Sequence, residues 1–80
     1  MDYLEIERGY SLAKMAAPAT ILGTALGQTT LRRTHGVTVT AFKTRDGGWQ
    51  NADNETVLAP GDKILIVGPT DRVEAFAQLR

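Results

Sequence analysis

Two adjacent arginines are the side chains in this sequence whose type and spacing point most directly to ligand chemistry. Arg32 and Arg33 each carry a planar guanidinium group, which binds phosphate or carboxylate through paired hydrogen bonds. They precede a stretch in which Thr38 and Thr40 alternate with apolar residues. The same two charges could instead stabilise the C-terminus of a helix, where the helix dipole favours cations. The residues alone leave both interpretations open.

The sequence offers little for catalysis or for metal binding. His35 is the only histidine, and there is no cysteine. A metal centre or a nucleophilic catalytic site needs several such groups close together. We therefore expect no catalytic residue and no metal ligand, and we place His35 on the surface beside a helix end. The sequence Asp46-Gly47-Gly48 indicates a turn and not a phosphate-binding loop, because it lacks the lysine and the following helix that such a loop requires.

A second group of cations lies close to the only tryptophan. Lys43, Arg45 and Trp49 combine charge with an aromatic ring, as in small β-domains that bind single-stranded nucleic acid. Nine basic and nine acidic side chains cancel, however, and only three of the basic ones are lysines. Nucleic-acid binding is therefore the weaker interpretation, and a tryptophan that covers a sheet edge is the favoured one.

The length and composition indicate the size of the domain and where the protein acts. Eighty residues form one domain with a thin core, so association with a second copy is expected. The acidic N-terminus does not resemble a signal peptide, and no run of about 20 apolar residues could span a membrane. Together with the absence of cysteine, these features favour a cytoplasmic protein that does not insert into the membrane.

The segment Lys63–Val67 predicts the central strand of a sheet. Pro60 and Gly61 suit a type II turn immediately before it. Four apolar residues then follow without alternation, which predicts a strand that is buried on both faces. After this strand, Thr70 or Asp71 is expected to cap a helix that extends to residue 79.

The N-terminal half predicts a strand and a helix. Residues 10–17 form a strand whose candidate buried side chains are Tyr10, Leu12 and Met15. From Thr24 the apolar spacing becomes helical, and we expect one short amphipathic helix that ends at Gly36. Gly27 weakens this helix and indicates that another segment packs closely against it.

A half-buried strand and a hairpin connect these parts. Residues 37–43 alternate between two faces, one with Val37, Val39 and Ala41 and the other with Thr38, Thr40 and Phe42. The turn at 46–48 then returns the chain into a short strand. The whole pattern predicts an α+β fold, a small, mostly antiparallel sheet of four or five strands with two helices.

Two segments together resemble a known family. Leu31–Lys43 contains a leucine–arginine pair, a glycine–valine pair and a strand, and Asn54–Gly68 contains a proline-glycine-aspartate turn followed by an apolar strand. This combination resembles the C-terminal subdomain (RCK_C, or TrkA-C) of RCK/TrkA-type regulators of potassium transport. The resemblance implies a regulatory domain over residues 10–80 that is not an enzyme. It also implies that residues 1–9 connect it to a missing N-terminal nucleotide-binding domain.

The resemblance further implies a homodimer that gates a membrane potassium channel or transporter, and the neutral net charge argues against a nucleic-acid partner. In several bacterial regulators of this kind, the subdomain binds cyclic di-AMP at the dimer interface. The corresponding motif implies these ligand-binding residues here: Leu26, Arg32, Thr38, Val39 and Ala41. Gly27 replaces an aliphatic residue of that motif, Thr30 an aspartate, and Thr38 an asparagine. No G-x-G-x-x-G sequence is present, so no NAD or ATP site and no covalent cofactor are expected. The alternative is a dimerisation or interaction module without a small ligand.

Overall fold

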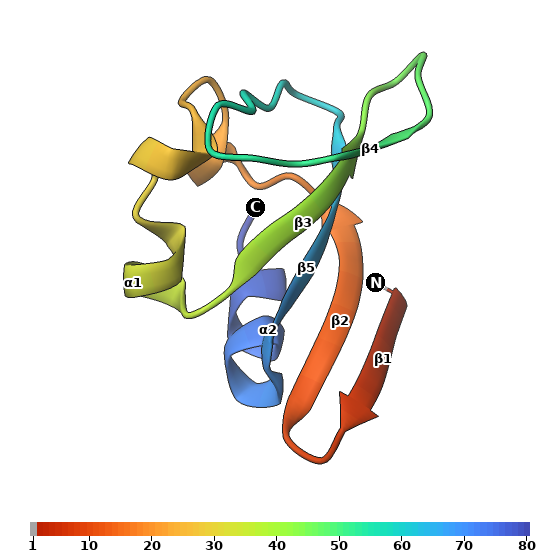
Figure 1. Ribbon diagram of the computed structural model, residues 1–80, viewed down its shortest axis with the longest axis vertical. Coiled ribbons are helices and arrows are strands. Elements are labelled where there is room, and N and C mark those ends of the chain that lie inside the picture. The colour runs from red at the N-terminus through yellow and green to blue at the C-terminus, as the bar shows by residue number, and fades with distance from the viewer. Residues whose placement is uncertain (1) are drawn as a thin grey trace.

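A five-stranded antiparallel sheet with the order β1-β2-β5-β3-β4 frames the structure, a computed structural model that describes residues 2–80 (Figure 1). The strands are β1 (Asp2–Glu7), β2 (Tyr10–Ala16), β3 (Thr38–Lys43), β4 (Trp49–Asn51) and β5 (Lys63–Pro69). The helices are α1 (Leu31–His35) and α2 (Thr70–Ala77), and two 3-10 turns are η1 (Ala19–Ile21) and η2 (Leu26–Gln28). This is the α+β fold, with a mostly antiparallel sheet and two helices, that the sequence predicts.

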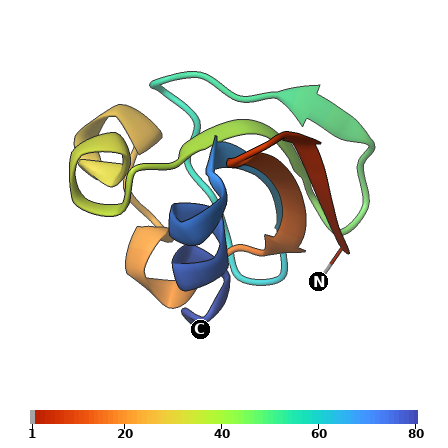
Figure 2. The same cartoon turned by 90° about the horizontal axis from the view of Figure 1, so that it is seen from below.

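The central strand is β5, as predicted. Ile64 and Ile66 are fully buried, whereas Leu65 and Val67 on the opposite face are only half-buried. The unbroken apolar run therefore marks the middle of the sheet, but full burial on both faces is wrong. Helix α2 packs on one face only, against β2 and β5 (Figure 2).

The turn before β5 has the predicted geometry. Gly61 takes a φ of +90°, which a type II turn requires at this position. The N–H of Asp62 donates to the carbonyl oxygen of Ala59 at 3.1 Å. The buried carboxylate of Asp62 accepts a hydrogen bond from the N–H of Ala59 at 2.9 Å, which closes the turn from the other side.

Strand β2 presents different residues to the core from those that its apolar side chains indicated. Ser11 and Ala13 are buried beneath α2, whereas Tyr10 is 46% exposed and Leu12 lies half-buried on the other face. The prediction was wrong for Tyr10 and Leu12, because α2 packs on the face of β2 that carries Ser11 and Ala13. Met15 does pack against the core, as predicted.

Helix α2 has Pro69 at its N-cap position, where Thr70 or Asp71 was predicted, and it ends at Ala77, two residues before the predicted end. Within the first turn, the carboxylate of Asp71 accepts a hydrogen bond from the N–H of Arg72 at 2.9 Å. The hydroxyl of Thr70 instead shares a 2.7 Å hydrogen bond with the hydroxyl of Ser11. The N–H of Thr70 donates to the carbonyl oxygen of Gly9 at 2.9 Å. The hydroxyl of Thr70, which the sequence predicted as a helix cap, is therefore bonded to the buried Ser11 instead.

Strand β3 contains a bulge that overturns its predicted alternation. Its register with β5 shifts between Val39 and Ala41, so Thr40 is an additional residue. Residues directly opposite each other on antiparallel strands share a face. Val39 and Phe42 both pair with the buried isoleucines of β5, and Phe42 packs against the core. Ala41 is therefore turned to the face opposite Val39, contrary to the prediction.

The segment predicted as one helix consists of two separate pieces. The 3-10 turn η2 ends before α1 begins, and Thr30 between them has a φ of +53°. This left-handed conformation cannot continue a right-handed helix, so the chain changes direction here. Gly36 ends α1 with a φ of +72°, as predicted.

The N-terminal residues form an edge strand. Strand β1 pairs with β2, and Met1 lies outside the described residues. That residues 1–9 connect to a further domain stays a prediction. Within residues 2–80, no helix has the length and apolarity that crossing a bilayer requires.

Candidate functional site

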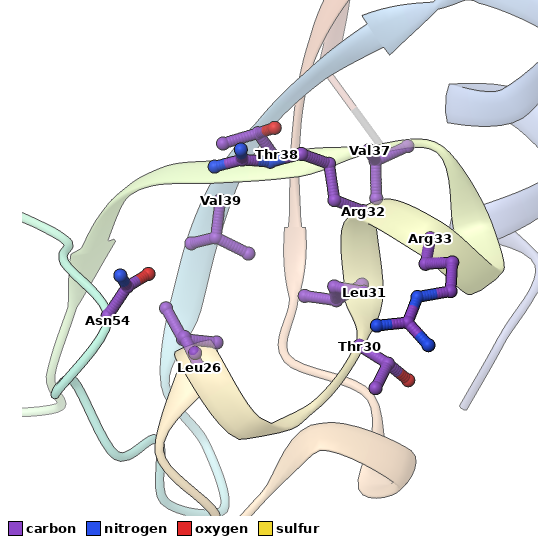
Figure 3. A pocket seen from close by; sticks show the side chains of 10 residues that line it. Leu26, Thr30, Leu31, Arg32, Arg33, Val37, Thr38, Val39 and Asn54 are labelled. Atoms are coloured by element: carbon purple, nitrogen blue, oxygen red, sulfur yellow. The ribbon is translucent and has the colours of Figure 1, made fainter.

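A pocket of about 520 Å³ opens between the segment η2–α1, the start of β3 and the loop that follows β4 (Figure 3). Its volume lies within the usual range for sites that bind small molecules. Its lining residues come from three separate parts of the chain: Leu26, Gly27, Thr30, Leu31, Arg32, Arg33, Val37, Thr38, Val39 and Asn54.

The floor of the pocket is apolar. Leu31, Val37 and Val39 belong to the hydrophobic core and are 6%, 1% and 8% exposed. Leu26 is half-buried and packs against the same core. Because these side chains are held by close packing, they offer a fixed apolar surface on which a flat ring could lie.

Two cations stand beside this floor. Arg32 and Arg33 are exposed, and neither guanidinium forms a hydrogen bond or an ion pair within residues 2–80. Figure 3 shows the Arg32 side chain extending from α1 toward Thr38 on β3. Both arginines belong to the last turn of α1, so they also lie where the helix dipole favours cations. An anionic group placed over the floor would find charge-assisted donors that no other residue occupies.

The backbone between η2 and α1 is strained within the pocket. Among residues 2–80, Thr30 is the only residue other than glycine that has a positive φ. Its hydroxyl donates to the carbonyl oxygen of Thr29 at 2.7 Å and lies 3.1 Å from the hydroxyl of Thr34. A β-branched residue in this conformation carries a free-energy cost, and such costs cluster at functional sites.

Asn54 closes the end of the pocket opposite α1 (Figure 3). Its carbonyl oxygen accepts a hydrogen bond from the N–H of Gly27 at 2.9 Å. A Cβ atom added at Gly27 would lie 2.8 Å from the Cβ of Asn54, so only glycine permits this approach. The close packing that Gly27 predicted is therefore confirmed, with Asn54 as the neighbour.

The pocket brings together four of the five residues that the resemblance indicates. Leu26, Arg32, Thr38 and Val39 line it, and Ala41 does not. Ala41, which pairs with Leu65 on β5, does not line the pocket, so its place in a ligand site stays a prediction. Arg33, which its residue type indicated, and Gly27 and Thr30, which stand at motif positions without an assigned role, also line the pocket. The lining residues that sequence reasoning missed are Leu31, Val37 and Asn54.

His35 lies outside this pocket. It is half-buried, and its ring meets that of Phe76 edge-on at a centroid distance of 5.1 Å. Across residues 2–80, no three histidine or carboxylate side chains gather closely enough to hold a metal ion.

One protein-family model matches the chain, that of the TrkA-C domain, over residues 11–79. No curated protein matches it. Residues 11–79 include all the residues that line the pocket.

Several solved structures share the fold. The RCK domain of GsuK superposes with a TM-score of 0.76 at 24% identity, over 88% of this chain and 16% of that one. A structure described as the GsuK channel bound to NAD gives a TM-score of 0.76 at 23% identity, over 90% of this chain and 14% of that one. The RCK C domain of the potassium transport protein KtrA, in complex with cyclic di-AMP, gives 0.69 at 18% identity. That match covers 86% of this chain and 81% of the KtrA domain, whereas this chain spans less than a fifth of either GsuK chain.

Proposed function

The chain belongs to the TrkA-C domain family, whose members are regulatory domains and not enzymes, and we propose that it regulates a potassium channel or transporter by binding cyclic di-AMP. In this proposal, residues 10–80 form the ligand-binding domain and residues 1–9 connect it to a preceding domain. The protein acts in the cytoplasm, where it contacts the membrane only through its channel or transporter partner.

The observation that carries the proposal is the pairing of an apolar floor with a free arginine in one pocket. Leu26 and Val39 can cover the flat face of an adenine, and Arg32 can pair with a phosphate. The hydroxyl of Thr38 lines the same pocket and can reach a polar edge of the base. The KtrA domain in complex with cyclic di-AMP has the same fold, which supports this choice of ligand.

The symmetry of the ligand favours a site shared by two copies of the chain. Cyclic di-AMP has two-fold symmetry, so each half can meet the same residues of one subunit in a two-fold dimer. An 80-residue domain buries a small core, and association with a second copy adds buried surface. We therefore place the ligand between two pockets, with one Arg32 at each phosphate. Ala41 is left out of this site because it does not line the pocket.

Calorimetric titration of cyclic di-AMP into the chain, together with sedimentation, tests the proposal. We expect saturable binding of one ligand per two chains and a sedimenting species of twice the 8.7 kDa monomer mass. NAD serves as the comparison ligand because a GsuK structure contains it, and we expect no binding of NAD. Absence of cyclic di-AMP binding, or one ligand bound per monomer, would contradict the proposal. In the first case, a dimer without ligand would indicate an interaction module.

A further inference from the structure

We infer that Asn54 recognises the base in this pocket and selects adenine over guanine. This inference rests on the proposed function, because it concerns the same pocket and a nucleotide ligand. It goes further by assigning the choice of base to a loop residue far from α1 and β3 in the sequence.

The loop around Asn54 is held in one conformation by its own hydrogen bonds. The N–H of Asp53 donates to the hydroxyl of Thr56 at 3.0 Å, and the N–H of Glu55 donates to the carboxylate of Asp53 at 2.8 Å. The N–H of Thr56 also donates to the carbonyl oxygen of Asp53 at 3.2 Å. The main chain on both sides of Asn54 is therefore fixed before any ligand arrives.

The same loop is attached to the floor of the pocket. The N–H of Gly27 donates to the carbonyl oxygen of Asn54, and the N–H of Leu26 donates to that of Thr56, each at 2.9 Å. Gly27 and Asn54 are in van der Waals contact, since a Cβ at Gly27 would overlap the Asn54 side chain. The main chain and Cβ of Asn54 are thus held in place relative to Leu26.

The amide of Asn54 is available to a ligand. It forms no hydrogen bond with any other residue among residues 2–80, and it is exposed. In Figure 3 it stands at the end of the pocket near Leu26 and Val39, and Arg32 approaches from α1 on the other side. A base lying over the two aliphatic side chains would direct one polar edge toward Asn54, with its phosphate on the arginine side.

An asparagine amide matches adenine and not guanine. Its oxygen accepts a hydrogen bond from the N6 amino group of adenine while its nitrogen donates to N7. Guanine presents oxygen O6 in place of that amino group, which leaves the amide oxygen opposite another acceptor. Among the lining side chains, Asn54 alone carries a separate donor and acceptor on one planar amide, because arginines only donate and a threonine hydroxyl is a single rotating group. The apolar floor cannot distinguish the two bases.

Titration of cyclic di-AMP and cyclic di-GMP into the wild type, Asn54→Ala and Asn51→Ala tests the inference. Asn51 is the matched control, because it is also exposed and does not line the pocket. We expect the wild type and Asn51→Ala to prefer cyclic di-AMP. In Asn54→Ala, affinity for cyclic di-AMP falls at least about tenfold while affinity for cyclic di-GMP stays the same. Gly27→Ala, which displaces Asn54 without changing its amide, should reduce the same preference, and thermal melts confirm that each variant is folded.

The outcomes separate this inference from the proposed function. If the wild type binds cyclic di-AMP and Asn54→Ala retains its preference for it, the inference is wrong and the proposed function stands. The inference is equally wrong if the wild type binds both dinucleotides alike. If the wild type binds neither, the proposed function fails and the inference fails with it.

Discussion

Replacing Arg32 with alanine removes the cation that we place at each phosphate of the ligand. The guanidinium of Arg32 is exposed and has no partner within residues 2–80, so the substitution breaks no internal hydrogen bond or ion pair. A hydrogen bond to a charged group contributes about 1.5–3 kcal/mol, and the hydration of this exposed guanidinium favours the lower end. Because a two-fold site loses the contact twice, binding should weaken by about 3 kcal/mol, which is a rise of about 150-fold in Kd.

The assay is calorimetric titration of cyclic di-AMP into wild type, Arg32→Ala and Arg8→Ala. Arg8 is the matched control, since it is exposed in the turn between β1 and β2 and lies outside the pocket. Arg32→Lys keeps the charge but not the planar donor pair, so its affinity should fall between those of the wild type and Arg32→Ala. Thermal melts separate a loss of binding from a loss of folding. Equal affinity of Arg32→Ala and wild type would refute the placement of Arg32 at the phosphate.

Three further predictions concern stability, each measured as the free energy of unfolding in urea. Gly68→Ala should lower the free energy of unfolding by about 1–3 kcal/mol, because the new Cβ would lie 2.8 Å from the carbonyl oxygen of Gly36. Gly48→Ala is the control and should cost far less, since a Cβ at Gly48 would have no atom within 4 Å. Similar values for the two variants would contradict this packing. Ser11→Ala should lower the free energy of unfolding by about 1 kcal/mol, because it removes the partner of the Thr70 hydroxyl. If the effects of Ser11→Ala and Thr70→Val simply add in the double variant, the two hydroxyls do not stabilise each other and the prediction is wrong. Thr30→Asn should raise stability by up to about 1 kcal/mol, since asparagine tolerates a φ of +53° better than a β-branched residue, and a loss of stability would contradict the strain.

Much of the fold follows from local sequence. The unbroken apolar run of β5 predicted the centre of the sheet, and the proline-glycine turn before it takes the predicted conformation. The glycine turn at 46–48 predicted the hairpin of β3 and β4, and a helix was predicted after β5, where α2 lies. These features were predictable because turn geometry and apolar periodicity act over a few neighbouring residues.

The candidate site was predictable only where its residues adjoin in the chain. The segment from Leu26 to Val39 contributes nine of its ten lining residues, and the family resemblance indicated four of them. Asn54 could not be found in this way, although Gly27 indicated that some segment would pack against it. Nothing local identifies which segment does so, because contacts between distant residues depend on how the whole chain folds.

Only the tertiary structure decided which side chains face the pocket and the core. A single additional residue in β3 turns Ala41 away from Val39, because side chains alternate along a strand and one inserted residue reverses the faces that follow. The left-handed Thr30 likewise divides a segment whose apolar spacing indicated one helix. In β2 the packing of α2 selected Ser11 and Ala13 over larger apolar neighbours. Composition and periodicity could not predict these outcomes, because each depends on the fit between elements that come together only in the folded protein.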